Sequence, residues 1–414
     1  DKTSQTVPFS FFDGALPENL WQYLAGYEQK TGGRAVAIPH NGNMSNGLMF
    51  SDKMPDGQPM TRAYAEQRIR WEPLHEMSQI KGDEETHPLL SPEDEFADFE
   101  NWDVGNLAGT APKEEWMLQY EYARPALKLG LKLGNELGVN PYKFGLNATT
   151  DSHTALPTSR EENYFGKYQH TEPSPERHNR EVIPADDPAL RIMTSQEVAS
   201  GLTAVWSREN TREAIFDALV RKEVYATTGT RIRVRVFGGF DFTDDDLQAA
   251  DFAKTGYSRG VPMGGDLTRA PGGKAPSFLI RALRDPDGAN LDRVQVIKGW
   301  LDAKGETHER IYDVAVSDGR KVEADGRCRT PVGNSVDIEK ATYTNSIGDV
   351  VLAAHWTDPD FDPRESAFYY ARVLEIPTPR WTTHDAAFYS IDLPDNVPPT
   401  IQDRAYTSPI WYTP

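Results

Sequence analysis

The sequence contains a single cysteine among its 414 residues. This residue, Cys328, lies in a polar stretch, so the chain can form neither an intrachain disulfide nor a thiolate metal cluster. Any bound metal must therefore be held by His, Asp and Glu. The chain also lacks an apolar run of the roughly 18 to 20 residues that a membrane helix needs, and we expect no membrane span.

Positive charge is scarce as well. Lys and Arg number 44 against 63 Asp and Glu, which gives a formal net charge of −19. Nucleic acids bind basic surfaces, so we expect no nucleic-acid partner. A small anionic substrate at a metal centre remains compatible with this composition, because the ion itself supplies local positive charge.

The chain begins at Asp1, with neither a methionine nor a signal segment. We therefore expect a processed or partial product. One cysteine beside nine tryptophans suits a periplasmic or secreted protein, which we expect, as well as a cytoplasmic one. The length favours two domains, and 32 glycines with 30 prolines indicate a loop-rich protein.

Helical and strand-like patterns alternate three times in the first part of the chain. Helical spacing covers 17–30, 64–71 and 114–137, with a break expected near Pro125. Buried strands are predicted over 34–38, 74–80 and 144–148, each after one of these helices. This alternation predicts parallel βα units, whose chemistry lies at the carboxyl ends of the strands.

All three predicted strand ends carry residues of metal-ligand type: His40, then Glu76, then Asp151 with His153. In extended chain, side chains two apart point the same way, so Asp151 and His153 form half a shell for a divalent ion. Alternatively, Asp151 caps the next segment and His153 is an ordinary surface residue. Glu76 is either a ligand or a buried partner of His75.

The sequence pattern changes after residue 230, where short β-type runs begin. Residues 155–195 are polar and proline-rich and read as a long surface loop, and 211–222 is an amphipathic helix. Short β-type runs separated by turns then indicate an antiparallel sandwich over 231–375. The last segment, 376–414, shows no periodicity and is expected to be an extended tail that packs on the body.

Several segments resemble the DUF3604 family of uncharacterised proteins. They are Ile38-Pro-His40-Asn-Gly-Asn43, Glu76-Met-Ser-Gln-Ile-Lys-Gly-Asp-Glu-Glu-Thr-His87-Pro, Thr150-Asp151-Ser-His153-Thr, Tyr225-Ala-Thr-Thr-Gly-Thr230 and the ending Ile401 to Pro414. The resemblance covers essentially the whole chain. The family in turn looks like a branch of the PHP (polymerase and histidinol phosphatase) superfamily.

This resemblance implies a seven-stranded, TIM-like βα barrel that binds two or three divalent ions (Mn, Zn or Fe) and hydrolyses phosphate esters. His40 matches the superfamily's third histidine motif, and Asp151 and His153 match its closing Asp-x-His motif. Glu76 matches a ligand position at which many relatives carry histidine. The implied substrate is a small anionic ester.

The chain departs from the superfamily pattern at its start. The opening His-x-His pair, the Asp-His and the bridging Glu are missing, because the first histidine is His40. The chain therefore looks like a family member without its first barrel strands. Either a separate N-terminal fragment supplies those strands, or they are not included in this sequence. The expected fold class is α/β, with an incomplete barrel over 1–230 and a C-terminal β-sandwich.

Further candidates lie on the loops beside these motifs. Lys81 is a candidate phosphate clamp and His87 a candidate proton donor, although a solvated charged loop explains both equally well. Asn41 and Asn43 orient a substrate or form an ordinary turn. Arg160 binds an anion or is simply exposed.

The leading functional hypothesis is a metal-dependent phosphoric-ester hydrolase, a phosphatase or phosphodiesterase that uses a metal-activated water. A binding or scaffold protein with a residual metal site is the alternative from another class, since the opening ligands are missing. The same ligand set also suits a sulfate-ester or amide hydrolase.

Overall fold

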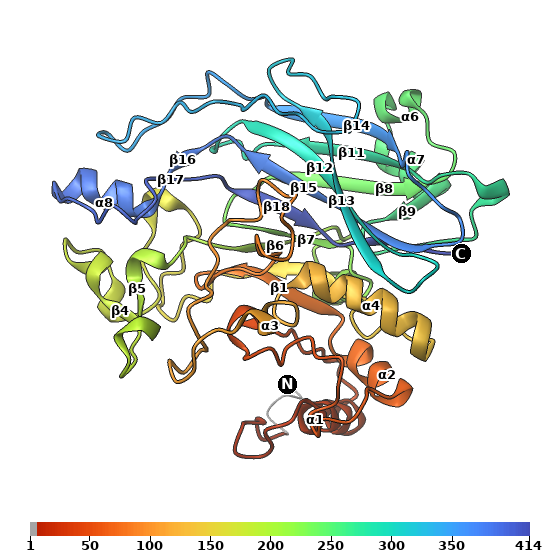
Figure 1. Cartoon of the computed structure of the whole chain (residues 1–414), viewed down its shortest axis with the longest axis horizontal. Coiled ribbons are helices and arrows are strands. Elements are labelled where there is room, and N and C mark those ends of the chain that lie inside the picture. Colours follow the sequence, from red (N-terminus) through yellow and green to blue (C-terminus); the bar gives the residue numbers. More distant parts are fainter. Residues whose placement is uncertain (1–5) are drawn as a thin grey trace.

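The computed structural model describes residues 6–414, which form a mixed α/β protein with several antiparallel sheets. Figure 1 shows the N-terminal helices α1 (Pro17–Thr31) and α2 (Arg62–Trp71) at one side of the molecule and the long strands at the other. These two helices confirm the predictions over 17–30 and 64–71. Gly32 ends α1 in the left-handed conformation, with φ of 64°, as a helix-terminating glycine does.

A small three-stranded sheet lies next. Strands β1 (Leu74–Gln79) and β3 (Gly145–Ala148) are parallel, and β2 (Gly82–Asp83) pairs antiparallel with β1. The predicted helix over 114–137 is two helices, α3 (Glu115–Leu118) and α4 (Ala123–Leu137). The break precedes Pro125, which stands in the first turn of α4, where a missing N–H costs nothing.

The predicted strand over 34–38 is instead an irregular segment beside β1. The Ala37 N–H donates to the Trp71 carbonyl (2.7 Å), and the Glu76 N–H donates to the Pro39 carbonyl (3.1 Å). The other two predicted strands are confirmed as β1 and β3. The sheets formed by residues 6–414 are open, and none of them closes into a barrel.

An eight-stranded sheet crosses the middle of the molecule in the order β10-β19-β15-β18-β7-β6, with β12 paired to β15 and β13 to β12. Its strands are β6 (Leu202–Val205), β7 (Val224–Thr227), β10 (Asp266–Thr268), β12 (Leu291–Leu301), β13 (Thr307–Val316), β15 (Ser366–Glu375), β18 (Arg404–Thr407) and β19 (Ile410–Thr413). All eight strands lie between residues 202 and 413, and the N-terminal strands β1, β2 and β3 form a sheet of their own. Residues 376–414, expected as an extended tail, supply β18 and β19.

A four-stranded antiparallel sheet packs on one face of the eight-stranded sheet. Its order is β14-β11-β8-β9, from β8 (Arg233–Gly239), β9 (Gly260–Pro262), β11 (Ser277–Leu283) and β14 (Val351–Thr357). Val294 and Val296 of β12 pack toward this sheet, whereas Ile297 packs toward β1, β3 and α4. The alternation follows from the two-residue repeat of a strand.

The remaining elements are short and peripheral. The helices are α5 (Arg212–Val220), α6 (Asp244–Gln248), α7 (Phe252–Arg259) and α8 (Trp381–Tyr389), and the strands are β4 (Glu181–Ile183), β5 (Ile192–Met193), β16 (Thr378–Pro379) and β17 (Thr400–Ile401). The 3-10 turns are Gly42–Met44, Glu161–Asn163, Gln169–Thr171, Arg177–Asn179, Pro188–Leu190, Thr194–Gln196 and Pro271–Gly273. Five of these turns and the β4–β5 hairpin lie in or at the edge of the predicted loop 155–195.

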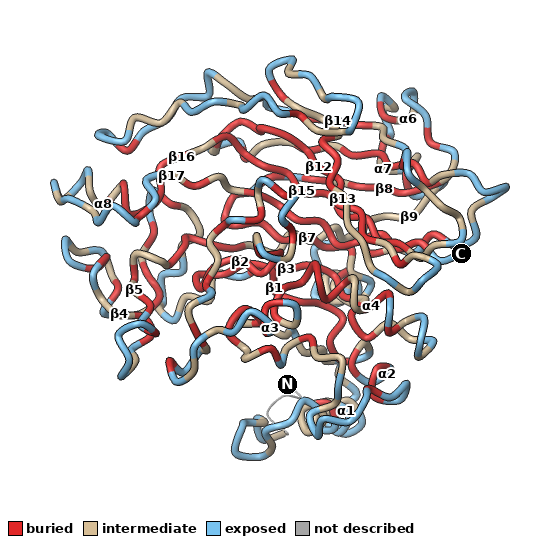
Figure 2. Tube along the Cα trace, in the orientation of Figure 1, coloured by how far each residue is buried: buried red, intermediate tan, exposed pale blue. Residues whose placement is uncertain are grey.

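Figure 2 shows that buried backbone concentrates in the sheets, whereas the outer loops and helix faces are exposed. Two large apolar clusters occupy the two faces of the eight-stranded sheet. Among the described helices, none has the length and apolar character needed to cross a membrane.

Candidate functional site

The carboxyl ends of β1 and β3 lead into a cavity of about 370 Å³. We call it the β1–β3 cavity. Its lining consists of His40, Asn41, Lys81, Leu107, Ala108, Asp151, His153, Lys167, Tyr168, Val182, Ile183 and Pro184. Five of the nine residues singled out in the sequence therefore meet here, from three separate segments of the chain.

Asp151 and His153 converge, but not through extended backbone. Asp151 has φ of 52°, in the left-handed region that Asp tolerates better than most residues. The His153 Nε2 lies 3.0 Å from the Asp151 Oδ1. The His153 ring packs edge-on against the Tyr168 ring, with 5.1 Å between the ring centroids. The two side chains thus contact each other directly at the wall of the β1–β3 cavity.

Two lysines share the other oxygen of Asp151. The ammonium groups of Lys81 and Lys167 both donate to the Asp151 Oδ2. Lys167 also donates to the Asp151 carbonyl (2.9 Å), and Lys81 donates to the Gln79 Oε1 (2.6 Å). Both lysines are buried, with residue exposures of at most 5%. Such pairing of one carboxylate with two buried ammonium groups leaves the polar part of the cavity basic.

These contacts shift two pKa values. Burial raises the pKa of the Asp151 carboxyl, but hydrogen bonds from Lys167 and Lys81 outweigh it and bring that pKa to about 2. Burial and the charge of Lys81 lower the pKa of Lys167 to about 8, against the opposing effect of Asp151. Asp151 is therefore ionised at neutral pH.

His40 and Asn41 form the rim. His40 is exposed, and its Nδ1 lies 3.4 Å from the Ile38 carbonyl. Asn41 has φ of 60°, and its Oδ1 accepts from the Gln79 amide (3.0 Å). Gln79 thus connects the rim to Lys81, since its own Oε1 accepts from that lysine.

Glu76 lies beneath the β1–β3 cavity and does not line it. It is the third residue of β1, opposite Asn147 of β3, rather than a residue at the strand end. Its carboxylate accepts from Gln79 (3.0 Å) and from the Thr149 hydroxyl. Burial raises the pKa of Glu76, and the neighbouring Glu84 adds to the rise. Glu76 thus belongs to the hydrogen-bonded layer that supports the rim.

The partner of His75 is Glu84, not Glu76. Neighbouring residues of a strand point to opposite sides, so Glu76 faces away from His75. The His75 Nε2 lies 2.8 Å from the Glu84 Oε2, while the Glu84 Oε1 is buried without a hydrogen-bond partner. Burial raises the pKa of Glu84 to about 8 and lowers that of His75 to about 3. This pair is therefore neutral near pH 7.

Three sequence candidates lie elsewhere. The His87 Nε2 is 3.1 Å from the Asp103 carboxylate, and its ring packs on Tyr122 rather than at the β1–β3 cavity. Asn43 is buried and donates to the Lys81 carbonyl (3.0 Å), which is a positioning contact. Arg160 lines a different cavity, of about 300 Å³.

Sequence reasoning missed Lys167 and the apolar wall opposite it. Lys167 stands in the predicted surface loop 155–195, where nothing in its spacing distinguishes it from a solvated lysine. Its backbone carbonyl accepts from the His153 N–H (2.9 Å), so the loop folds back on the Asp-x-His motif. The only feature of the sequence that points to Lys167 is its position after the Asp-x-His motif, in a loop rich in turns.

The donor types around β1 and β3 suit a divalent ion, because imidazole and carboxylate groups bind Mn, Zn and Fe. The Glu84 Oε1 is buried without a hydrogen-bond partner, but Glu84 does not line the β1–β3 cavity and burial raises its pKa to about 8. Both oxygens of Asp151, however, already contact protein side chains. Within residues 6–414, three ligand atoms lie within 4.8 Å of one another only at Asp302, Glu306 and His308, in the β12–β13 turn. The donors fit an ion in kind, while the described residues alone leave its coordination incomplete.

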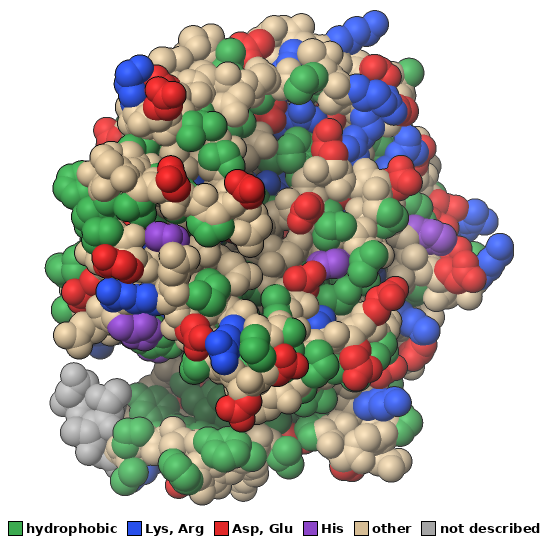
Figure 3. All heavy atoms as spheres, turned by 60° about the vertical axis from the view of Figure 1, so that its left-hand side comes forward, with side chains coloured by type: hydrophobic (Ala, Val, Ile, Leu, Met, Phe, Trp, Pro, Cys, Tyr) green, Lys and Arg blue, Asp and Glu red, His purple; other side chains and the backbone are tan. Residues whose placement is uncertain are grey.

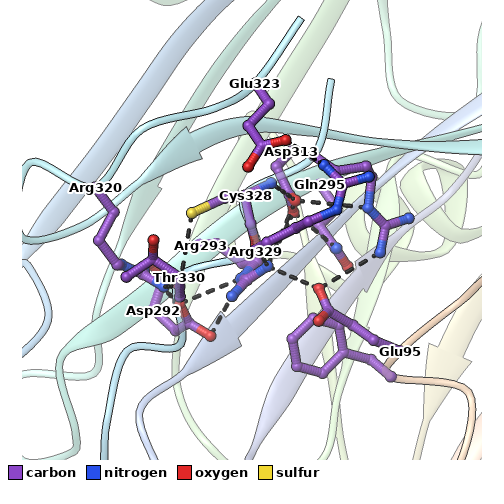
Figure 4. Close-up of polar contacts among 12 residues, drawn as sticks. Glu95, Asp292, Arg293, Gln295, Asp313, Arg320, Glu323, Cys328, Arg329 and Thr330 are labelled. Carbon is purple, nitrogen blue, oxygen red and sulfur yellow. Dashed lines mark hydrogen bonds and ion pairs between the residues drawn. The ribbon is translucent and has the colours of Figure 1, made fainter. Parts of the chain in front are cut away.

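A larger polar cavity, of about 480 Å³, lies where the loop around Cys328 meets β13. Figure 4 shows its buried side: the Cys328 N–H donates to Asp313 (2.7 Å), and Arg293 donates to the Cys328 carbonyl (3.2 Å). Each arginine of this region pairs with at least one carboxylate: Arg329 pairs with Asp325, and Arg293 and Arg327 share Glu95 and Asp313. Its charges are therefore balanced, unlike those of the β1–β3 cavity.

Fold and site together define a mixed α/β protein with a basic cavity at the carboxyl edge of a small parallel pair of strands. The sequence matches, over residues 1–414, the family model described as "Protein of unknown function (DUF3604)", and the chain belongs to that family. No match was found among curated proteins, and none among solved structures.

Proposed function

We propose that this protein is a metal-dependent hydrolase of small anionic esters, most simply phosphate esters. The observation that carries the proposal is the basic lining of the β1–β3 cavity, where Lys81 and Lys167 share Asp151 within a chain of net charge −19. In so acidic a protein, two buried lysines at one cavity concentrate positive potential where an anion binds.

Each residue has a role in this proposal. Lys81 and Lys167 bind the oxygens of the anionic group through charge-assisted hydrogen bonds. His40, Asp151 and His153 hold the ions, and Glu76 orients the rim from below. A bound divalent ion lowers the pKa of a water toward neutrality and offsets charge on the phosphoryl oxygens.

We further propose that the family is a branch of the PHP superfamily and that strands outside these 414 residues complete a TIM-like barrel. Two features support this. Strands β1 and β3 form a parallel pair with an irregular segment hydrogen-bonded alongside. The donors of the β1–β3 cavity also need further ligands to enclose an ion. A separate N-terminal fragment is the partner that would supply them.

Metal analysis tests the ligand assignment. After equilibrium dialysis against micromolar Mn²⁺ or Zn²⁺, the wild type is expected to retain metal that Asp151→Ala and His153→Ala lose. The matched control is His308→Ala, which disrupts the exposed Asp302–Glu306–His308 cluster instead. Metal content unchanged in both cavity variants would overturn the assignment, and a loss in His308→Ala would then place the metal at the Asp302–Glu306–His308 cluster.

A substrate panel tests the reaction. The panel contains an aryl phosphate, a diaryl phosphate, an aryl sulfate and an anilide, each assayed with each metal. We expect the wild type to hydrolyse the phosphate esters and Asp151→Ala to lose this activity. Turnover of the sulfate or anilide alone would move the reaction to those bonds. Metal bound at Asp151 and His153 without any turnover would favour a binding or scaffold protein.

A further inference from the structure

The β1–β3 cavity has two unlike walls. Its polar wall carries the two lysines with Asp151 and His153. Its apolar wall comes from two segments that are far apart in the sequence, a loop at residues 107–108 and the end of β4 with the residue that follows; it consists of Leu107, Ala108, Val182, Ile183 and Pro184. The proposed function uses only the polar wall, so the apolar wall has no role in it. Figure 3 turns the β4 side of the molecule toward the viewer, where histidine, charged and apolar side chains lie next to one another on a hollowed surface.

The apolar wall is rigid at its base and open at its top. Val182 and Ile183 are 8% and 6% exposed and pack in one cluster with Met44 and Trp102. Leu107, in contrast, is 48% exposed, although its N–H donates to the Met44 carbonyl (3.3 Å). An isolated exposed leucine needs no explanation. A half-exposed leucine beside a fixed apolar base, opposite charged groups, is typical of a ligand pocket.

The wall continues beyond the β1–β3 cavity. An adjoining cavity of about 550 Å³ shares Ala108 and Pro184 with it; its lining continues with Ala185 and Leu190 on the apolar side and with Thr110, Asp186 and Asp187 on the polar side. Gly109 holds the two loops together there. It has φ of 64°, and a Cβ at this position would lie 2.8 Å from the Pro184 carbonyl oxygen. Only glycine allows so close an approach in that conformation, so the two loops meet beside the residues that the two cavities share. We call the two adjoining cavities together the groove.

We propose that this groove binds an extended apolar substituent of the anionic ester, so that the preferred substrates are esters of long-chain or aromatic alcohols. The inference rests on the proposed function, because the lysine pair fixes the anionic group at one end. The rest of the ester must then leave the polar wall, and the path along Leu107 and Pro184 is the apolar one.

A series of alkylphosphonates tests the groove without requiring turnover. Methyl-, butyl-, hexyl- and octylphosphonate share one anionic head and differ only in the chain, and their affinities are measured by calorimetry. In the wild type, affinity is expected to rise roughly two- to fourfold per added methylene until the chain passes the groove. Leu107→Ser is expected to reduce the gain from methyl to octyl by about tenfold. Leu89→Ser replaces another exposed leucine, which lines neither cavity, and should leave the gain unchanged.

The outcomes separate the groove from the hydrolase proposal. Methylphosphonate binding with no gain along the series would overturn the groove and leave the anion site intact. An equal gain in wild type and Leu107→Ser would place the chain elsewhere and also overturn it. Absence of binding for every phosphonate would overturn both proposals. A chain-dependent gain that Leu107→Ser reduces, in a protein without turnover, would support the groove and count against the hydrolase.

Discussion

Asp151 is the residue at which the charges of the β1–β3 cavity converge. Both of its oxygens are engaged, one by His153 and the other by Lys81 and Lys167. A carboxylate shared by two buried ammonium groups neutralises only one of them. The surplus positive charge is therefore a property of three residues acting together, and each lysine should contribute measurably to anion binding.

Removal of one lysine charge tests this directly. Lys167→Gln keeps the length of the side chain approximately and removes its charge, so sulfate affinity is expected to fall by roughly ten- to a hundredfold, because a charge-assisted hydrogen bond contributes about 1.5–3 kcal/mol. Sulfate is a suitable probe because its charge is constant near neutral pH. Lys304→Gln, at an exposed position in the β12–β13 turn, is the control. Equal sulfate affinities in wild type and Lys167→Gln would contradict the role of this lysine.

Glu197 provides a prediction on pH. Burial raises the pKa of this carboxyl to about 7, although the Tyr164 hydroxyl donates to it (2.6 Å) and favours the charged form. Between about pH 4.5 and pH 7 the folded state keeps a proton that the unfolded state releases, so its stabilising contribution is complete at low pH and is lost as pH rises.

Glu197→Gln removes that proton exchange and retains an acceptor for Tyr164. The wild type is expected to lose roughly 2–3 kcal/mol more unfolding free energy than the variant between about pH 5 and pH 8. Urea unfolding at several pH values measures the difference. Any effect of the amide on stability that does not depend on pH cancels, because only the change in unfolding free energy with pH is compared. Parallel pH profiles for the two proteins would show that Glu197 does not titrate as described.

The candidate site was only partly predictable from the sequence. Asp151 and His153 carry a recognisable short motif, and they do meet at the β1–β3 cavity. Lys167 carries no such pattern, because its position depends on how a long loop folds back. Glu76 and Glu84 illustrate a third case: both are buried carboxyls near β1. Alternation along the strand excludes Glu76 as the partner of His75, whereas the contact with Glu84 depends on how the chain turns back after β1.

At the level of elements, the predicted helices and most strands are confirmed, because amphipathic spacing and glycine stops are local signals. The strands β18 and β19 were missed for a physical reason. Every residue of β18 is buried, as are the first three residues of β19. A strand covered on both faces has no polar–apolar alternation to detect. The strand predicted over 34–38 is wrong for the opposite reason. Its apolar run is a local signal for a strand, but the segment lacks a full set of backbone hydrogen-bonding partners.

Strand β19 is expected to be important for stability despite its position near the chain end. It lies between β10 and β15, and Trp411 is 3% exposed within the main apolar cluster. Trp411→Ala is expected to cost about 3–5 kcal/mol of unfolding free energy, by lost burial and the cavity that remains. Thr413→Ala, at the exposed end of the same strand, should change stability by less than about 0.5 kcal/mol. Comparable urea midpoints for the two variants would show that β19 is dispensable.

At the scale of the whole molecule, the parts predicted as barrel and sandwich are joined by a buried ionic network. Arg372 of β15 donates to Glu85 (2.8 Å) and to Asp94 (2.7 Å), and Arg124 of α4 pairs with the same two carboxylates. All four side chains are at most 2% exposed. Strands from both parts also lie in the eight-stranded sheet, where β18 joins β7 to β15, so neither part can separate without exposing charges and hydrogen-bonding groups.

This arrangement predicts a single cooperative unfolding transition for the whole chain, seen at the same denaturant concentration by tryptophan fluorescence and by circular dichroism. Arg372→Met removes one charge of the network and leaves two buried carboxylates with Arg124 alone, at an expected cost of about 3–5 kcal/mol. Because the network joins both parts, the two probes should shift together. Arg364→Met, which removes an exposed arginine paired with Asp362, should change the midpoint little. Two separate transitions in the wild type, or a shift of only one probe in Arg372→Met, would mean that the two parts unfold independently in spite of their shared sheet.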